Sequence, residues 1–280
     1  MSANVSMRDA LYEAPGPKTQ RLVRIGTAIS VVLLVAFVAF VLRQFYVNDQ
    51  LNPKYWSFFL RWTTWRFLLR GFLGTIKVAI TAGIIAMALG LLLMLGRISP
   101  NRALSAVCHV ITDLFRSLPS LLLIYFFFLV IPKYGLRMPA FWMITIPVAL
   151  AASGVLAEVF RAGVNAVPKG QVEAAMALGM THGKITRKIV LPQALKIVIP
   201  SLVSQLVVVV KDTTVAYVVS YPDLMQNARV LISNYDALVS MYFVVALLYI
   251  AVNYATNQFS IYLAHRSDTP VISRVDENPV

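Results

Sequence analysis

Long stretches that carry almost no charge are the feature that most limits what this chain can fold into. Several windows of about 20 residues are nearly free of charged side chains, and a helix of that length crosses a hydrocarbon layer of roughly 30 Å. Only 13% of the 280 residues are charged and 59% are hydrophobic, whereas a soluble domain carries about 25% charged residues. A soluble protein with so apolar a surface would aggregate, so the sequence predicts an integral membrane protein.

Six apolar segments are predicted to span the membrane as helices. Only helices and closed barrels satisfy their backbone groups in lipid, and the chain lacks the alternating ten-residue segments typical of barrel strands. The expected fold class is therefore all-α, with about six transmembrane helices. The predicted spans lie near 25–46, 71–95, 113–132, 139–164, 200–220 and 238–263. The first has no convincing cleavage site and is expected to stay in place as an anchor.

The basic residues predict an orientation. The chain has 25 Lys and Arg against 12 Asp and Glu, a balance that nucleic-acid binders also show. Here the basic residues flank apolar runs, which is typical of cytoplasmic loops. The basic loop 165–199 is therefore expected in the cytoplasm, and with six spans both termini lie there too. The segment 43–70 disagrees, because it is basic yet external, and its aromatic part near 55–72 is interpreted as lying along a membrane interface.

The loop 165–199 contains the most specific pattern in the chain. From Glu173 to Pro192 it reads EAA-x3-G-x9-I-x-L-P. Glu173 to Leu178 predicts a short helix with its carboxylate in the first turn, and Gly179 is expected to end that helix in a left-handed conformation. A second short basic helix follows, and Pro192 is expected to interrupt the chain before the next span. The sequence thus predicts a helix–turn–helix knuckle outside the membrane.

This pattern resembles the cytoplasmic loop of ABC importer permeases, and other segments resemble the polar amino-acid branch of that family. These segments are 157–163 (AEVFRAG), 167–171 (VPKGQ), 114–119 (LFRSLP, where the branch has Gly-Thr in place of Ser-Leu) and 211–214 (KDTT). The likeness covers about 68–263. Together with the extra first span, it is similar to glutamate importer permeases of actinobacteria.

The resemblance implies a division of the chain and a set of partners. We expect a cytoplasmic tail (1–24), an extra first helix with an external or interfacial segment (25–67), a permease core (68–263) and a second cytoplasmic tail (264–280). The implied partners are an ABC ATPase dimer, an extracytoplasmic substrate-binding protein, and a second, homologous permease chain in a heterodimer. The implied location is the bacterial plasma membrane, and the implied mechanism is alternating access that imports a polar amino acid, with glutamate as the particular expectation.

The knuckle is the part that the resemblance assigns to the ATPase. It implies that the knuckle fits a groove of the ATPase and passes motion to the spans. The expected coupling residues are Glu173, Ala174, Ala175, Leu178, Gly179, Ile189, Leu191 and Pro192. The chain itself has no Walker A motif, since Gly179 stands one position too close to Gly183-Lys184, and Ile185 replaces the Ser or Thr that holds Mg²⁺. ATP and Mg²⁺ are therefore expected on the partner, and this chain is not expected to be an enzyme.

Charged and hydroxyl residues at membrane depth are candidates for the substrate pathway, because burying charge in lipid is costly. Glu158 and Arg161 share a helical face and are expected to pair, as a structural link or a gate. Helix packing and backbone bonding of the hydroxyls are the alternative to direct substrate contact. The pathway candidates are Arg116, Ser153, Glu158, Lys211, Asp212, Thr213, Thr214 and Thr75.

Other function classes have weaker support in the sequence. An ion-gradient-driven secondary transporter would show interrupted helices in repeated halves, and no internal repeat is evident. A membrane-embedded enzyme needs a nucleophile–base or metal constellation, but the single Cys108 and three widely separated histidines provide none. A structural anchor would not explain the loop motif. The sequence leaves open which amino acid is carried and how permease chains pair.

Overall fold

The computed structural model describes residues 16–266, which form two units that divide after Ser57. Most of the two predicted polar tails, 1–15 and 267–280, lies outside the described residues. Within the described range all regular elements are helical, as the sequence predicts for an all-α membrane protein. Five helices are long and apolar enough to cross a membrane, and a bent pair raises that number to six.

The first unit contains the helix α2 (Pro17–Val47), which is longer than the predicted span 25–46. Pro17 starts the helix, where the missing N–H of proline has no cost and its fixed φ favours the first turn. A short turn follows, with a 3-10 helix at η1 (Pro53–Tyr55). The Trp56 indole donates to the Gln50 carbonyl at 3.1 Å and closes this turn.

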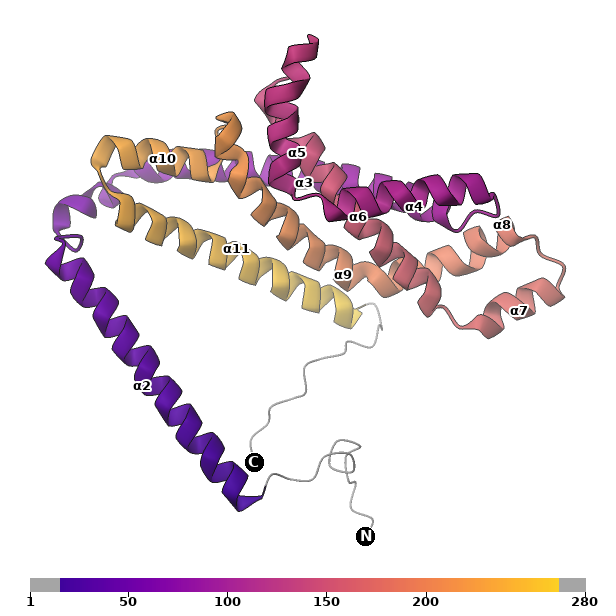
Figure 1. Cartoon of the computed structure of the whole chain (residues 1–280), viewed down its shortest axis with the longest axis horizontal. Coiled ribbons are helices and arrows are strands. Elements are labelled where there is room, and N and C mark those ends of the chain that lie inside the picture. Colours follow the sequence, from indigo (N-terminus) through magenta and orange to yellow (C-terminus); the bar gives the residue numbers. More distant parts are fainter. Residues whose placement is uncertain (1–15, 267–280) are drawn as a thin grey trace. The chain divides into compact units, whose positions relative to one another are not determined.

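The second unit, Phe58–Val280, holds the remaining spans (Figure 1). Its long or span-forming helices are α3 (Trp62–Arg97), α4 (Arg102–Ser117), α5 (Ser120–Tyr125), α6 (Ala140–Ala166), α9 (Leu191–Asp212) and α11 (Leu238–Arg266). The shorter elements are η2 (Ser57–Leu60), η3 (Phe126–Val130), η4 (Ile131–Tyr134), α7 (Lys169–Ala177), α8 (His182–Ile185), η5 (Thr186–Val190), η6 (Thr213–Val219) and α10 (Leu224–Tyr235).

Helix α6 is the centre of the second unit and packs against α3, α4, α5 and α9. Small residues of α3 form one of these contacts, because Ala82 and Ala86 are completely buried. A Cβ added to Gly90 would lie 2.9 Å from the Leu156 Cβ, so only glycine lets the two backbones approach this closely. Ala82, Ala86 and Gly90 follow one another at a spacing of four residues, so they form a small-residue stripe that serves helix packing within the chain.

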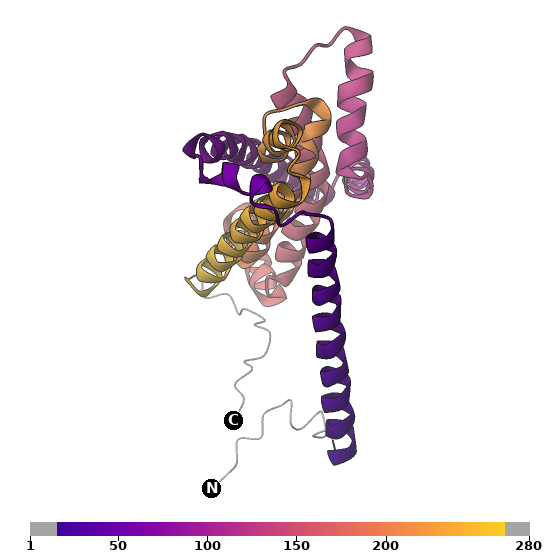
Figure 2. The same ribbon diagram turned by 90° about the vertical axis from the view of Figure 1, so that its left-hand side faces the viewer.

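The third predicted span is not one straight helix. Helices α4 and α5 meet at 97°, with the break at Leu118 and Pro119. Proline disfavours the helical conformation of the residue before it, and Leu118 is accordingly extended, with ψ 126°. Figure 2 shows the segment that starts with α5 standing away from the rest of the second unit. The predicted span 113–132 combined the end of α4 with α5 and thus missed the bend.

Two other predicted boundaries were wrong. Helix α3 begins at Trp62 and not near residue 71, so the second part of the segment 43–70 belongs to a long helix. Its first turn is held by the Thr64 hydroxyl and the Trp65 indole, which donate to the carbonyls of Phe58 and Phe59 at 2.8 and 2.7 Å. The second wrong boundary is the start of the fifth span. The helical course from His182 to Val219 is continuous, whereas the sequence predicted a loop up to residue 199.

The sequence interpretation missed the helix α10, which packs against α3 and α11. Its buried residues Leu224, Ala228 and Leu231 recur at helical spacing, but the helix is too short and polar to be recognised as a span. Asp223 caps it by accepting the Gln226 N–H at 2.7 Å. An Asp before an i, i+4, i+7 apolar pattern was the signal that could have found it.

Candidate functional site

The knuckle predicted from the EAA pattern consists of α7, a tight turn and the start of the long helical course through α8 and α9. It lies at the end of the second unit opposite to α10 (Figure 1). Gly179 has φ +72°, the left-handed conformation that the sequence predicted. The Gly179 N–H donates to the Met176 carbonyl at 2.9 Å, and the Met180 N–H donates to the Ala175 carbonyl at 3.1 Å. This pair of bonds is the Schellman motif, which ends α7 sharply and turns the chain back.

The two faces of α7 differ in their surroundings. Ala175 is 3% exposed and packs in a small core with Val167, Ile185, Val190 and Ala194. On the outer side Leu178 is 83% exposed and Met176 is 54% exposed. Glu173 and Ala174 are exposed as well. Large apolar side chains that face outward from a short, well-anchored helix are typical of a docking surface.

The inner half of the motif holds the knuckle to the spans. Ile189 and Leu191 are partly buried and pack against the two hydrophobic clusters of the second unit. The Gln193 amide donates to the Gln171 side chain and to the Ile189 carbonyl, so it links α7 to the start of α9. Of the predicted coupling residues, Ala175, Ile189 and Leu191 therefore face inward, and Glu173, Ala174, Leu178 and Gly179 face outward.

Two details of the predicted knuckle were wrong. Glu173 lies in the second turn of α7, because this helix already begins at Lys169. Pro192 does not interrupt the chain but stands in the first turn of α9, directly after the π turn η5. Proline is tolerated in a first turn, and the widened π turn before it accommodates its ring without a break.

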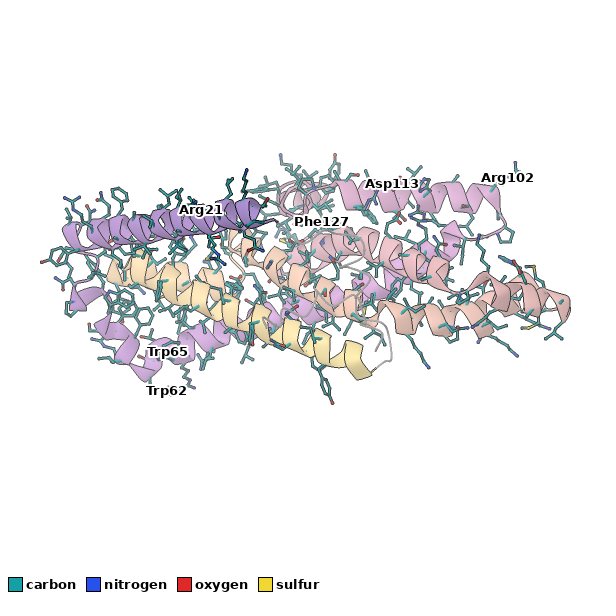
Figure 3. The ribbon with its side chains drawn as sticks, turned by 90° about the horizontal axis from the view of Figure 1, so that it is seen from below. Arg21, Trp62, Trp65, Arg102, Asp113 and Phe127 are labelled. Atoms are coloured by element: carbon teal, nitrogen blue, oxygen red, sulfur yellow. The ribbon has the colours of Figure 1, made fainter. Side chains whose placement is uncertain are left out.

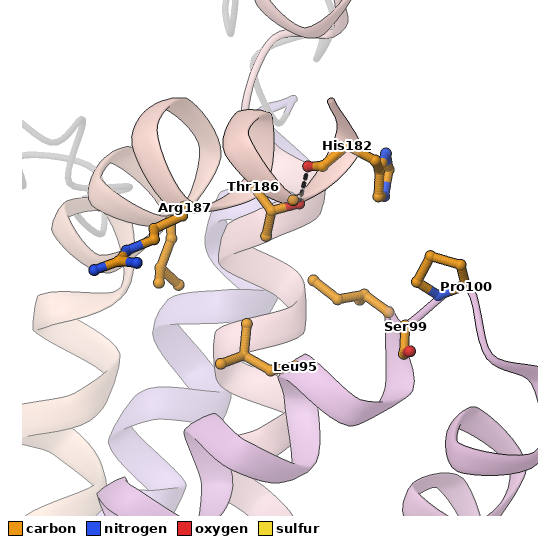
Figure 4. Close-up of a pocket in the computed structure, with 9 residues that line it drawn as sticks. Leu95, Ser99, Pro100, His182, Thr186 and Arg187 are labelled. Atoms are coloured by element: carbon orange, nitrogen blue, oxygen red, sulfur yellow. Dashed lines mark hydrogen bonds between the residues drawn. The ribbon is translucent and has the colours of Figure 1, made fainter. Parts of the chain in front are cut away.

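A cavity of about 530 Å³ lies between the knuckle and the turn that joins α3 to α4 (Figure 4). Ser99 and Pro100 line it from that turn, and His182 and Arg187 line it from the start of the second knuckle helix. The Thr186 hydroxyl donates to the His182 carbonyl at 3.0 Å and stiffens this start. The knuckle thus adjoins the ends of α3 and α4 as well as α9.

A cluster of charges lies where α3, α4 and α6 meet, and Glu158 is its centre. The Arg161 Nε donates to Glu158 Oε2 at 2.8 Å, so the predicted pair is confirmed. Arg97 at the end of α3 comes closer still, with Nη1 2.6 Å from Glu158 Oε1, and Arg116 lies 3.9 Å from the same oxygen. The sequence missed Arg97, because 61 residues separate it from Glu158 and no local pattern signals the contact. One carboxylate therefore ties three helices together.

The remaining pathway candidates are not brought into one site. The Ser153, Thr213 and Thr214 hydroxyls donate to carbonyls of their own helical segments at 2.7 to 2.8 Å, as the alternative interpretation expected. Lys211 and Asp212 are the last residues of α9, and the helical course continues from them through η6 to Val219. Lys211 is exposed, and Asp212 faces Ser120.

Thr75 belongs to a buried polar group near α10. Its hydroxyl donates to the Gly71 carbonyl at 3.3 Å and accepts the Leu224 N–H at 3.1 Å. Close by, Asp223 is fully buried, and its Oδ2 has no partner in the described part of the chain. Burial raises the pKa of the Asp223 carboxyl to about 6. This aspartate was not among the predicted site residues.

Known proteins place this arrangement in a family. The family described as "Binding-protein-dependent transport system inner membrane component" matches residues 86–268. The glutamate transport system permease protein GluD of Corynebacterium glutamicum is 33% identical over 241 residues, covering 83% of this chain and 88% of that protein. The probable glutamine ABC transporter permease protein GlnP of Bacillus subtilis is 35% identical over 193 residues, covering 68% and 88%.

Solved structures agree with the sequence relatives. A crystal structure described as an amino acid ABC transporter with histidines matches with a TM-score of 0.69 at 27% identity, covering 72% of this chain and 94% of that chain. The family match and the relatives identify the chain as a membrane-embedded transport subunit. The chain belongs to the inner membrane components of binding-protein-dependent ABC transport systems. The resemblance to permeases of the polar amino-acid branch is thereby confirmed.

Family membership defines the coarse role of the chain. It is the multi-pass inner membrane permease, not the ATPase, and it carries no cofactor of its own. A binding-protein-dependent system of this kind also includes an ATPase and a substrate-binding protein.

Proposed function

We propose that this permease imports a polar amino acid, specifically glutamate, by alternating access driven by an ATPase that docks on the knuckle. The observation that carries the coupling part is the geometry of α7, whose Leu178 is 83% exposed while Ala175 anchors it from the other side. A rigid, outward-facing apolar contact lets a partner push on the spans without first deforming the knuckle.

The coupling residues divide into two roles in this proposal. Glu173, Ala174 and Leu178 contact the ATPase, and Gly179 sets the angle at which they are presented. Ala175, Ile189, Leu191 and Pro192 carry the movement into α9. The neighbouring α3–α4 turn gives a second connection, through the cavity between Ser99 and His182.

The proposed orientation places the knuckle and both termini in the cytoplasm. The outer surface of the second knuckle helix carries Lys184, Arg187 and Lys188, and the first turns of α2 carry Lys18 and Arg21. Basic residues concentrate on the cytoplasmic side of membrane proteins, which supports this orientation. We further propose the division into tails, extra first helix (25–67) and permease core (68–263).

The substrate pathway is proposed to use the charges at membrane depth, with Glu158 and Arg161 as its inner gate. The Glu158 cluster joins three helices, so breaking it would let those helices separate. Arg116, Lys211, Asp212 and the neighbouring hydroxyls are proposed to line the pathway when a second, homologous permease chain completes it. The glutamate assignment is supported by the relative named for glutamate transport, which matches most of this chain.

The coupling part is tested by recovery of the ATPase. The change Leu178→Asp places a charge on the exposed docking side and is expected to reduce the ATPase co-purified with this chain at least tenfold, since desolvating an unpaired carboxylate is costly. Leu136→Asp is the matched control, because Leu136 is also exposed (61%) but lies in the α5–α6 loop. Equal recovery of the ATPase with both variants would refute docking at the knuckle.

The substrate part is tested by uptake into proteoliposomes that contain the complete transporter, with ATP on the knuckle side. Glutamate is expected to be taken up and to be displaced by excess unlabelled glutamate but not by arginine. Uptake of glutamine in preference to glutamate would replace the substrate while leaving the permease assignment intact.

A further inference from the structure

A second cavity, of about 420 Å³, lies beside the α3–α4 turn and is lined mainly by cationic and hydroxyl side chains. Arg97 comes from the end of α3, Arg102 from the start of α4 and Arg161 from α6, and none of the described residues that line the cavity is a carboxylate. The other polar lining side chains are Ser99, Ser105 and His109. Three guanidinium groups from three helices converge on one hollow.

The nearby carboxylates neutralise only part of this charge. Both oxygens of Glu158 are already engaged, one by Arg97 at 2.6 Å and the other by Arg161 at 2.8 Å. Asp113 lies 3.6 Å from Arg116 and 3.7 Å from Nδ1 of the lining residue His109. Arg102 makes no ion pair among the described residues, and Arg161 bonds to Glu158 through its Nε. Arg97, Arg102, Arg116 and Arg161 thus stand against only two carboxylates, Glu158 and Asp113, so the group keeps an excess of positive charge.

Helix α4 combines this polar face with an apolar one. Arg102, Ser105 and His109 are spaced by three and four residues, so they share one side of the helix. Exposed apolar residues lie further round the same helix, with Val110 nearest to the polar side, roughly 80° from Arg102. Leu104, Val107, Val110 and Leu114 are 47 to 67% exposed. Figure 3 shows Arg102 at the start of α4 and Asp113 further along it, with Trp62 and Trp65 at the far end of α3.

The position along the spans is that of a membrane boundary. Arg97 is the last residue of α3 and Arg102 the first of α4, and both helices belong to membrane-crossing segments. Ile98 and Ser99 line this cavity and also the one beside the knuckle. The cationic cavity is therefore on the same side of the membrane as the knuckle.

We propose that this cavity binds the phosphate headgroup of an anionic phospholipid, with the acyl chains along the apolar side of α4. Guanidinium groups bind phosphate oxygens through paired hydrogen bonds, and basic pockets between membrane helices are suited to anionic headgroups. A free phosphate ion or a substrate carboxylate would use the arginines but not the exposed apolar residues of α4. That the lipid belongs to the cytoplasmic leaflet rests on the proposed orientation of the knuckle.

The test is native mass spectrometry of the purified chain in detergent, titrated with phosphatidylglycerol or, as the neutral comparison, phosphatidylcholine. Phosphatidylglycerol is expected to bind in preference. Arg102→Gln, which breaks no ion pair of the described chain, is expected to weaken that binding about fivefold. Arg137→Gln is the matched control, because Arg137 is exposed in the α5–α6 loop and should leave binding unchanged.

Three results would overturn the proposal. They are equal binding of both lipids, unchanged phosphatidylglycerol binding by Arg102→Gln, and displacement of the lipid by millimolar inorganic phosphate or glutamate, which would identify a small-anion site. Because the measurement needs neither ATPase nor transport, its failure is distinguishable from failure of the proposed function.

Discussion

At the scale of single residues, the chain carries one backbone constraint and one buried charge that substitutions can measure. Gly179 holds a left-handed conformation with nothing within 4 Å of its would-be Cβ, so a side chain there meets backbone strain and no steric clash. Asp223 is buried with one oxygen unpartnered within the described chain, so its cost arises from charge. Gly179 affects the turn of the knuckle, and Asp223 affects the packing of α10.

Gly179→Ala is expected to destabilise the knuckle turn by about 1 kcal/mol, because a left-handed conformation is unfavourable for any residue with a Cβ. ATP-driven uptake in proteoliposomes should fall, while the spans stay folded. Gly170→Ala is the control: Gly170 is exposed in α7, also has open space around it, and has no positive φ. Equal uptake by the two variants would mean that the turn geometry does not matter.

Asp223 is expected to make stability depend on pH. The folded protein binds its proton more tightly than the unfolded chain, because the pKa rises from 3.8 to about 6 on burial. The contribution to stability is therefore fully present below about pH 4 and is lost as the pH rises through about 6. Asp223→Asn, which keeps an oxygen for the α10 cap, should raise stability at pH 8 by up to roughly 3 kcal/mol.

Thermal unfolding in detergent at pH 5 and pH 8 measures this effect. The gain from Asp223→Asn should be larger at pH 8. Asp236→Asn is the control, since Asp236 is exposed at the end of α10. A gain independent of pH would assign the effect to packing and not to the titration of Asp223.

At the scale of elements, α3, α4 and α6 are joined by tight backbone packing along their length and by charges at one end. The Glu158 side chain is 19% exposed and that of Arg97 is 10% exposed, so the central pair of this cluster is shielded from water. By contrast, Asp113 is 44% exposed and pairs with Arg116 along α4 alone. The Arg97–Glu158 pair connects two helices, whereas the Asp113–Arg116 pair lies within one helix.

Glu158→Gln is expected to lower the free energy of unfolding by about 3 kcal/mol, because Arg97, Arg161 and Arg116 lose their shared partner while remaining close together. Asp113→Asn, the matched acid-to-amide change on a more exposed pair, should cost less than about 1 kcal/mol. Denaturant or thermal unfolding of both variants in detergent checks the difference. A similar small cost for both would show that Glu158 does not hold the helices together.

At the scale of the whole molecule, the chain consists of an apolar helix, α2, and a separate unit with its own core. The match to the solved amino acid transporter chain covers 94% of that chain but only 72% of this one. The rest of this chain therefore lies outside the shared fold. The second unit buries its core through contacts among α3, α6, α9 and α11.

Replacing α2 with an unrelated apolar helix of equal length is expected to preserve ATPase recovery and uptake, because the core buries its own apolar surface. The basic residues Lys18, Arg21 and Arg24 should be kept, since they favour the orientation of the first span. Deleting α2 completely would be a different experiment, because removing one span would change the side of the membrane on which the following segments lie. Loss of uptake in the replaced protein would assign α2 a specific contact in transport.

The sequence alone determined features that depend on local pattern. Apolar length predicted helical spans, the EAA pattern predicted the knuckle, and Gly179 took the predicted left-handed turn, because each depends on neighbours within a few residues. The pairing of Glu158 with Arg161 was equally local, since the two are three residues apart.

Only the tertiary structure decided the features that depend on distant residues. The contact of Arg97 with Glu158 spans 61 positions, and the Asn227 amide of α10 donates to the Phe67 carbonyl across 160 positions. The 97° bend before α5 and the burial of Asp223 likewise follow from how helices pack. Chain separation hides such contacts from a sequence pattern, because their energy comes from surfaces that meet only after the helices have assembled.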